Sequence, residues 1–386
     1  VYLNSLKGLL HMSQSPNIAD APASPDAPAS PAAAEYGHTV HAPTHTSPAA
    51  TTGHNSGYTS ALPSIHANLL RRGIQAAFAV FLTWMAYNFY LYVLWATGKS
   101  QTFTPKPPSV EGFLPISELM AARRLFETGQ WDAVHPAGLT LFLAIALMAL
   151  LFRKGFCGYI CPVGFVSNLL GRLGERLGLN RTPPRKLELA LQAIKYIPLA
   201  LLGYFSLFAM SVDEIEAFMG APFNMVADSS MLFFFLRTST TTLIVVGVIV
   251  AASLVVRNAW CRFLCPYGAF LGLFALASPV AVCRNAATCT SCRRCQRVCP
   301  SAIAVHQKAR VNSPECLGCT ACIEACPQKN CLHLDAAGRR VPFWTVAVGC
   351  LVVLLGAYVW AVYTGHWVSE IPPAMLRRFH MIQFGG

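Results

Sequence analysis

The feature that most constrains this chain is a run of cysteines that occurs twice in tandem between positions 289 and 327. The first run reads Cys289-Thr-Ser-Cys292-Arg-Arg-Cys295-Gln-Arg-Val-Cys299-Pro300. The second reads Cys316-Leu-Gly-Cys319-Thr-Ala-Cys322-Ile-Glu-Ala-Cys326-Pro327. In both, three evenly spaced cysteines are followed by a fourth that directly precedes a proline. Thiols gathered in this way indicate a cluster of metal ligands, a zinc ribbon or a disulfide knot.

The spacing favours one of these three readings. Zinc takes four ligands per site and has no need of two runs with a fourth cysteine before proline. The same spacing is typical of bacterial two-cluster ferredoxins, in which three thiolates hold one [4Fe-4S] cluster and the fourth reaches the other. We therefore predict two [4Fe-4S] clusters. The expected ligands are Cys289, Cys292, Cys295 and Cys326 for the first cluster, and Cys316, Cys319, Cys322 and Cys299 for the second.

The composition indicates that the chain is also a membrane protein. Of the 386 residues, 54% are hydrophobic and only 12% are charged, because the chain contains apolar blocks long enough to cross a bilayer. We predict five spans, at 74–97, 136–152, 189–210, 238–256 and 341–364. The segment 268–282 is also apolar, but it is short and contains Pro279. We expect it to form an interfacial or re-entrant helix.

Charge predicts how the spans are oriented. Segment 153–186 has seven Lys or Arg against one acid, whereas segment 212–238 has one against four. Basic segments face the cytoplasm, which predicts a multi-pass protein of the bacterial inner membrane with the cysteine runs on the cytoplasmic side. Fourteen of the 15 cysteines fall in the two basic segments, where a reducing compartment would keep them as thiols. The net charge of +12 comes with no nucleic-acid motif, so we expect no nucleic-acid partner.

A second cysteine motif also occurs twice. After the second predicted span the chain reads Arg153-Lys-Gly-Phe-Cys157-Gly-Tyr-Ile-Cys161-Pro, and after the fourth it reads Arg257-Asn-Ala-Trp-Cys261-Arg-Phe-Leu-Cys265-Pro. This duplication predicts two copies of a helical hairpin, each ending in Cys-x3-Cys-Pro. Each pair of thiols could bind a metal, form a dithiol, or contribute to a joint four-thiolate site. Buried cysteines with no chemical role are the alternative.

The predicted fold is a polytopic α-helical membrane protein of about five spans, with a two-fold repeated helical hairpin and an inserted small α+β dicluster ferredoxin domain. The domain boundaries follow from composition. We expect a disordered Ala/Pro/His-rich segment at 1–66, a membrane domain at 67–282, the ferredoxin domain at 283–340, the last transmembrane helix at 341–364, and a periplasmic tail at 365–386.

Two Cys-x3-Cys-Pro motifs followed by a dicluster ferredoxin resemble the membrane polyferredoxins of the NapH, NosR and CcoG type. Phrases such as Leu114-Pro-Ile and His135-Pro-Ala-Gly-Leu139 are similar to the NosR type. NosR-type proteins carry a periplasmic flavin domain before the first shared span. In this chain a low-complexity segment takes that place, and it contains no flavinylation motif. The resemblance implies electron transfer at a bacterial inner membrane that serves respiratory or denitrification enzymes, or copper handling for an oxidase.

We therefore predict an electron-transfer subunit rather than a stand-alone enzyme. It would pass electrons between a cytoplasmic or quinone donor and a periplasmic acceptor, with other electron-transfer subunits or a periplasmic reductase as partners. The alternatives are a copper-handling protein that uses the four Cys-x3-Cys thiols, and a membrane redox sensor. Four ionisable residues are candidates for quinone or proton contacts: His135, Lys195, Asp228 and Arg237. For Lys195 and Arg237 we favour simple anchoring at the membrane interface.

Overall fold

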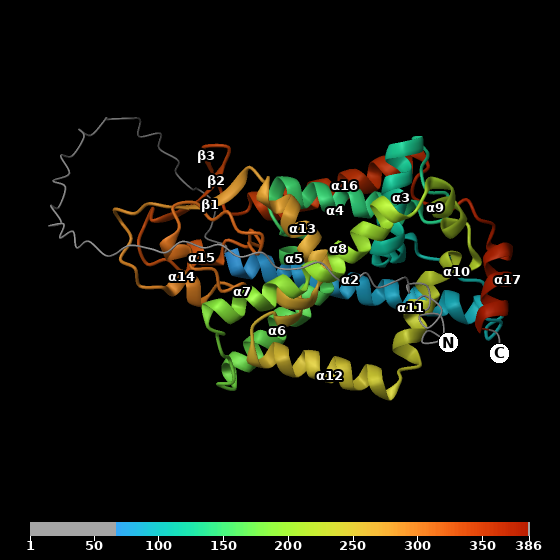
Figure 1. Cartoon of the computed structure of the whole chain (residues 1–386), viewed down its shortest axis with the longest axis horizontal. Coiled ribbons are helices and arrows are strands. Elements are labelled where there is room, and N and C mark those ends of the chain that lie inside the picture. The colour runs from blue at the N-terminus through green and yellow to red at the C-terminus, as the bar shows by residue number, and fades with distance from the viewer. Residues whose placement is uncertain (1–66, 385–386) are drawn as a thin grey trace, which may run out of the picture. The chain divides into compact units, whose positions relative to one another are not determined.

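The computed structural model describes residues 67–384 (Figure 1). The chain divides into two units, Val1–Ser60 and Ala61–Gly386, and the fold below is that of the second. The disorder expected for 1–66 lies outside the described residues. At the two ends of this unit lie β1–β3 and α17, and Figure 1 shows α2, α4, α12 and α16 running between them.

Three helical segments are long and apolar enough to cross a membrane, and a fourth qualifies if a bent pair counts as one span. The helices concerned are α2 (Ala67–Ala96), α7 (Arg185–Ile194) continuing through α8 (Tyr196–Tyr204) and the π-helix η2 (Phe205–Ala209), α16 (Thr345–Thr364), and the bent pair α11 (Ala227–Leu236) and α12 (Thr240–Val255). The pair bends by 83° because Ser239 begins α12 afresh, its hydroxyl accepting from the Thr242 amide. These apolar helices suggest a membrane protein, but the predicted count of five is not confirmed.

The second predicted span is the central helix of the unit. Helix α4 (Pro136–Phe152) begins at a proline, which suits the first helical position. Its 17 residues extend about 26 Å, less than the hydrocarbon thickness of roughly 30 Å. Most of the helix is buried and packs on α16 and α13, and its Leu139 and Met148 are fully enclosed. Helix α4 therefore organises the core, while α12 and α16 expose apolar side chains such as Leu243 and Val359.

The end opposite the strands is built from short helices and loops. They are η1 (Pro108–Phe113), α3 (Pro115–Thr128), α9 (Val212–Met219), α10 (Pro222–Met225) and α17 (Pro373–Phe384). A capping box between Ser211 and Glu214 begins α9, and Gly129 ends α3 in the left-handed conformation. Helix α17 falls in the predicted tail 365–386 and packs on α2, where its His380 is buried.

The ferredoxin-like segment contains a three-stranded antiparallel sheet in the order β1-β2-β3. Its elements are β1 (Val280–Arg284), α14 (Arg294–Arg297), η4 (Val305–Gln307), α15 (Ala321–Glu324), β2 (Leu332–Ala336) and β3 (Arg339–Val341). Strand β1 pairs with β2 in the register Val282↔Leu334. The expected helix over 268–282 is realised only as α13 (Pro266–Leu276), because Pro279 interrupts it and the apolar residues that follow form β1.

Each of the two Cys-x3-Cys-Pro segments forms a short helix followed by a longer one, and each longer helix packs on the helix that precedes the other motif. The first forms α5 (Gly155–Tyr159) and α6 (Pro162–Arg176), and the second forms the π-helix η3 (Trp260–Leu264) and α13. Helix α4, which precedes the first motif, packs on α13, which follows the second. Likewise α12, which precedes the second motif, packs on α6, which follows the first. This crossed packing brings the two motifs together, although a two-fold repeat of whole hairpins stays a prediction.

Candidate iron-sulfur and thiol sites

The structure gathers the eight cysteines of the tandem runs around two cavities. The first, of about 330 Å³, is lined by Cys289, Cys292, Cys295 and Cys326. The second, of about 390 Å³, is lined by Cys299, Cys316, Cys319 and Cys322. All eight are free thiols. Each run thus places three cysteines at one cavity and its fourth at the other, so the donors present fit the two expected [4Fe-4S] clusters.

The same backbone shape recurs in both runs. Ser291 and Arg293 adopt left-handed conformations, with φ of 53° and 59°. Gly318 and Thr320 occupy the corresponding positions of the second run, with φ of 63° and 55°. These residues curl each loop so that cysteines three positions apart face one cavity. Gly318 is also required by space, since an added Cβ would lie 3.1 Å from the Phe152 carbonyl oxygen.

The two cavities differ in their surroundings. Cys292 in the first is exposed, and the Arg294 backbone N–H lowers the pKa of its thiol. In the second, burial raises the pKa of Cys299 to about 12. A buried thiolate therefore needs a positively charged partner, which a metal centre supplies. The first site therefore lies at the surface and the second lies in the interior.

One cysteine at the first cavity was missed by the sequence analysis. Cys331 lines this cavity together with Arg284 and His306. It is buried, and its Sγ lies 3.8 Å from the Asn285 carbonyl oxygen. Cys331 belongs to no motif. It lies five positions after Cys326, and this closeness to the second run is the only signal in the sequence that points to it.

The four thiols of the second motif line a single large cavity. This cavity, of about 1750 Å³, is mostly apolar and is lined by Cys157, Cys161, Cys261 and Cys265 together with residues of α2, α4 and η1. Gly164 follows the first pair, and an added Cβ there would lie 2.5 Å from the Cys157 carbonyl oxygen. Burial raises the pKa of Cys161 and of Cys261 to about 12. The thiol cavity therefore suits a bound centre that supplies positive charge.

The thiol cavity adjoins the second cluster cavity. Ser301 and Leu317 line both of them. Cys316 accepts a hydrogen bond at its carbonyl oxygen from the Lys154 amide, at 3.3 Å. The three sets of cysteines thus form a series that begins at the surface, continues inside the ferredoxin-like segment and ends among the apolar helices.

A buried ion triad joins these parts. Glu315 pairs with Lys195 through one carboxylate oxygen and lies 3.4 Å from Lys154 Nζ through the other. All three side chains are buried. The expectation that Lys195 extends to the membrane interface is therefore wrong, because its amine points inward to the carboxylate beside Cys316. Arg237 is exposed at the bend between α11 and α12, 5.1 Å from the Phe233 ring.

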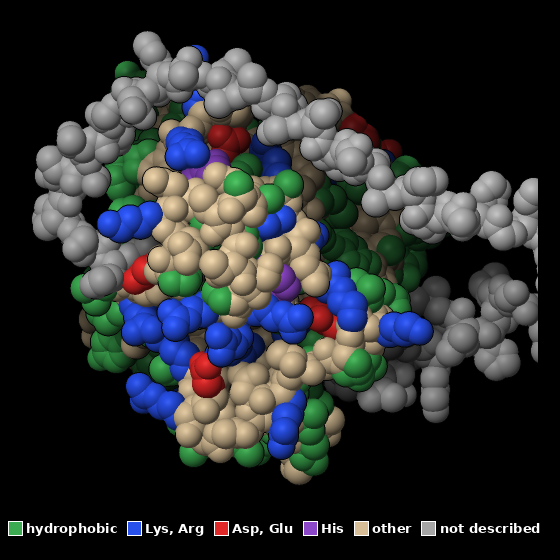
Figure 2. All heavy atoms as spheres, turned by 90° about the vertical axis from the view of Figure 1, so that its left-hand side faces the viewer, with side chains coloured by type: hydrophobic (Ala, Val, Ile, Leu, Met, Phe, Trp, Pro, Cys, Tyr) green, Lys and Arg blue, Asp and Glu red, His purple; other side chains and the backbone are tan. Residues whose placement is uncertain are grey.

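Several basic residues that predicted the orientation are buried as well. Arg153 donates from Nε to the Val280 carbonyl oxygen at 2.7 Å and from Nη1 to Asn312 at 2.8 Å. Arg262 pairs with Glu188 at 2.6 Å. Arg153 thus attaches the ferredoxin-like segment to the helices, and Arg262 joins η3 to α7, so the charge of both is used in packing rather than at a solvated surface. Figure 2 shows that many other Lys and Arg side chains do gather on the face that carries this segment.

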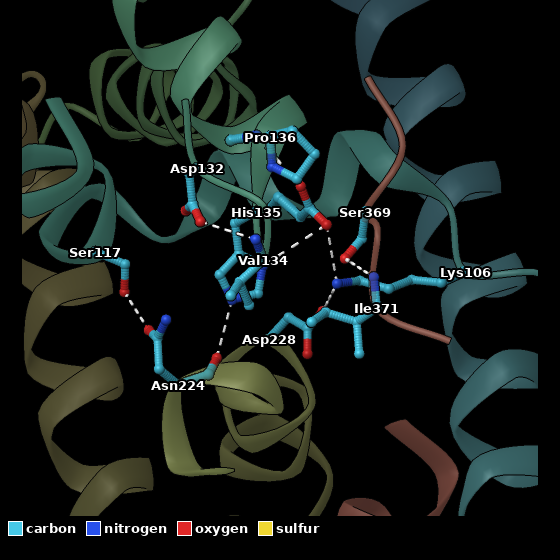
Figure 3. A network of polar contacts seen from close by, with 12 residues as sticks. Lys106, Ser117, Asp132, Val134, His135, Pro136, Asn224, Asp228, Ser369 and Ile371 are labelled. Carbon is cyan, nitrogen blue, oxygen red and sulfur yellow. Dashed lines mark hydrogen bonds and ion pairs between the residues drawn. The ribbon is translucent and has the colours of Figure 1, made fainter. Parts of the chain in front are cut away.

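His135 and Asp228 meet in a buried charge network at the opposite end (Figure 3). Lys106 Nζ lies 3.0 Å from Glu111 Oε1 and 2.8 Å from Asp228 Oδ2. His135 Nε2 lies 2.9 Å from the Asn224 carbonyl oxygen, to which it must donate, and Nδ1 lies 3.6 Å from Glu111 Oε1. A neutral imidazole would turn a lone pair toward that carboxylate. Although burial lowers the pKa of His135, the neighbouring Glu111 carboxylate raises it overall, so the fold favours the protonated imidazole.

Glu118 completes the network. Its side chain is only 1% exposed, and neither carboxylate oxygen has a hydrogen-bond partner among the described residues. Burial, followed by the Asp132 and Glu111 carboxylates, raises the pKa of Glu118 well above its ordinary value. The fold therefore favours the neutral form of Glu118, which keeps its proton to a higher pH than an exposed glutamate does.

Within residues 67–384, no three His, Cys, Asp or Glu side chains lie close enough together to hold a single metal ion.

Comparison with known proteins agrees with this cysteine chemistry. A family model described as "4Fe-4S binding domain" matches residues 134–180 and 238–280, which include the two Cys-x3-Cys-Pro motifs. A model described as "4Fe-4S dicluster domain" matches residues 281–327. The "putative electron transport protein YccM" of Escherichia coli K12 is 37% identical over 322 residues, covering 81% of this chain and 90% of YccM. The chain belongs to the same family as YccM, whose members are 4Fe-4S ferredoxin-type electron-transport proteins.

Other relatives match over shorter stretches. The "regulatory protein NosR" of Pseudomonas aeruginosa is 31% identical over 208 residues, covering 52% of this chain and 28% of NosR. The "methylamine utilization ferredoxin-type protein MauN" of Methylorubrum extorquens is 32% identical over 203 residues, covering 49% of this chain and 61% of MauN. No solved structure matches the chain.

Proposed function

We propose that this family member passes electrons through two [4Fe-4S] clusters between a partner at the ferredoxin end and a carrier in the thiol cavity. The observation that carries this proposal is the shared wall of Ser301 and Leu317 between the second cluster cavity and the thiol cavity. A cluster transfers electrons without forming bonds, so this chain contributes the thiolate ligands, the buried charges and the path.

The four thiols extend the path. We infer that Cys157, Cys161, Cys261 and Cys265 jointly hold a third iron-sulfur centre. The match of both motif segments to a 4Fe-4S binding model supports this, as does the convergence of the four thiols on one cavity. Lys154 and Lys195 place two positive charges against one carboxylate between this site and Cys316, which favours negatively charged thiolate centres on both sides.

The apolar part of the thiol cavity suits a quinone. The cavity extends from the thiols to Phe78 and Phe81 of α2 and to Gly112 of η1, next to the buried charge network. A quinone that accepts two electrons also takes up two protons to become a hydroquinone, and the reverse reaction releases both. We infer that Glu118 and His135 exchange these protons, because the fold favours the protonated form of each. Glu111, which faces His135, belongs to η1, and η1 lines the cavity.

The experiment that tests this function begins with anaerobic purification of the whole chain. Iron content and electron paramagnetic resonance after dithionite should show three cluster signals in the wild type. Replacing the four motif cysteines with serine should remove about four irons per chain and leave two signals. Cys350→Ser is the matched control, since Cys350 is buried in α16 and lines none of the three cavities. Unchanged iron in the four-serine variant would rule out the third centre.

Reduction by a hydroquinone tests the carrier. In wild-type nanodiscs, a water-soluble hydroquinone should reduce the clusters, or a quinone should oxidise them after dithionite. The four-serine variant should keep both ferredoxin signals but exchange electrons with quinones far more slowly. Equal rates in the two proteins would mean that electrons do not pass through the thiol cavity.

We also infer that the ferredoxin end faces the cytoplasm of a bacterial cell and that α17 faces the periplasm. Electrons that leave through the quinone would then serve a periplasmic reductase of respiratory or denitrification type. A fusion of alkaline phosphatase after Phe384 should be active, whereas a fusion at Gly338, in the turn between β2 and β3, should be inactive. The opposite result would reverse the orientation.

A further inference from the structure

A polar cavity, separate from the thiol cavity and the two cluster cavities, lies where α2 and α6 meet the ferredoxin-like segment. It measures about 860 Å³ and is lined by five arginines from four segments. We call it the arginine pocket; its arginines are Arg71, Arg72, Arg172, Arg257 and Arg297. The one acidic side chain in its lining is Glu175, which is already paired with Arg257. None of the cysteine sites uses this cavity.

The arginine pocket carries five positive side chains against one carboxylate in its lining. Arg72 and Arg172 have no acidic partner within residues 67–384. Burial, followed by the neighbouring Arg72 and Arg71, lowers the pKa of Arg172. Like charges held together in a partly enclosed space destabilise the fold unless an anion joins them. The arrangement therefore points to a ligand with more than one negative charge or acceptor oxygen.

Arg71 gives an independent indication of such a ligand. Its side chain is 5% exposed, and Nε donates to the Gly158 carbonyl oxygen at 3.0 Å, which fixes the guanidinium in place. The same guanidinium keeps Nη2 buried without a partner. A buried charged donor left unpaired costs free energy, which a bound oxyanion would recover. Phosphate oxygens match this fork of donors, because guanidinium groups bind phosphate through paired hydrogen bonds.

The position of the pocket favours a lipid as the source of the phosphate. Arg71 and Arg72 lie at the start of α2, a helix of membrane-spanning length. Helix α6 passes the pocket through Arg172 and exposes Leu169 and Leu173, an apolar strip of the kind that acyl chains cover. Basic pockets at the ends of spanning helices bind anionic headgroups in this way. We propose that the arginine pocket binds the phosphate of an anionic phospholipid headgroup.

The test compares Arg72→Gln/Arg172→Gln with Arg181→Gln in the full-length chain with its iron retained. Neither Arg72 nor Arg172 makes a described hydrogen bond, so the double variant should fold, and unchanged iron content verifies this. Arg181 is exposed and lies outside the pocket. Native mass spectrometry would measure binding of cardiolipin, phosphatidylglycerol, phosphatidylcholine and inorganic pyrophosphate.

We expect the wild type and Arg181→Gln to bind cardiolipin and phosphatidylglycerol, and the double variant to bind them roughly 30-fold more weakly. Phosphatidylcholine, which has no net charge, should bind weakly to all three. Equal lipid binding by the wild type and the double variant would overturn the proposal. Binding of pyrophosphate that depends on Arg72 and Arg172, without binding of the lipids, would also overturn it and would assign the pocket to a soluble phosphate compound.

Discussion

Replacing Glu315 should be far more damaging than replacing Lys195, although the two side chains pair with each other. Glu315→Gln leaves two buried lysines without a counter-charge. The attraction of unit charges 3.4 Å apart, the Lys154–Glu315 distance, is about 5 kcal/mol at an effective dielectric constant near 20. The desolvation of the carboxylate offsets part of this. The net cost of breaking such a buried pair is about 3–5 kcal/mol.

Lys195→Met, in contrast, removes one of the two positive charges and keeps the carboxylate. It leaves Glu315 with Lys154 as a neutral pair, and it removes the repulsion between the two amines. Methionine also fills the apolar volume of the lysine stem. We therefore expect the free energy of unfolding to change by less than about 1 kcal/mol, because exchanging a buried ion for a well-packed apolar group is often neutral.

Thermal unfolding in detergent measures both changes through tryptophan fluorescence and through bleaching of the iron-sulfur absorbance. The midpoint should fall by roughly 6 to 20 °C for Glu315→Gln and by no more than a few degrees for Lys195→Met. Lys186→Met is the matched control, since Lys186 is exposed on the same continuous helical segment. Equal shifts for the two variants, or a shift of only one or two degrees for Glu315→Gln, would refute the buried triad.

Three further predictions follow from individual side chains. Cys326→Ser should abolish the signal of the surface cluster and spare the inner one, whereas Cys299→Ser should do the reverse; paramagnetic resonance distinguishes them. The raised pKa of Glu118 favours its neutral form in the fold, so Glu118 stabilises below its ordinary pKa of 4.5 and this contribution is lost as pH rises through the raised value. The melting temperature of Glu118→Gln should therefore rise relative to that of the wild type as the pH becomes alkaline, whereas Glu127→Gln, at an exposed position, should follow the wild type. The same pH dependence in the wild type and both variants would contradict a raised pKa of Glu118. Gly138→Ala should cost about 1–3 kcal/mol in thermal unfolding, because its Cβ would meet the Glu118 carboxylate, and a neutral effect would show that Glu118 can move away.

The sequence alone determined the chemistry and the local grouping of ligands. The spacing of the tandem runs predicted which four cysteines share each cavity, because the reach of a short loop is set by covalent geometry. Apolar blocks likewise predicted membrane helices. Spacing along the chain also pointed to Cys157, Cys161, Cys261 and Cys265 as two related pairs. It left open whether the pairs act separately or jointly, since that depends on contacts between segments about 100 residues apart.

Only the tertiary structure decided where the charges lie and which segments meet. The crossed packing of α4 on α13 and of α12 on α6 brings the four motif thiols to one cavity. Other long-range contacts pair Lys195, an expected interfacial anchor, with Glu315 and place His135 beside Glu111 in a buried charge network. The sequence of an apolar segment does not distinguish a lysine or histidine that faces lipid or water from one that faces a buried carboxylate. The role of such a residue is set by the long-range contacts that fix its solvation, and no local pattern encodes them.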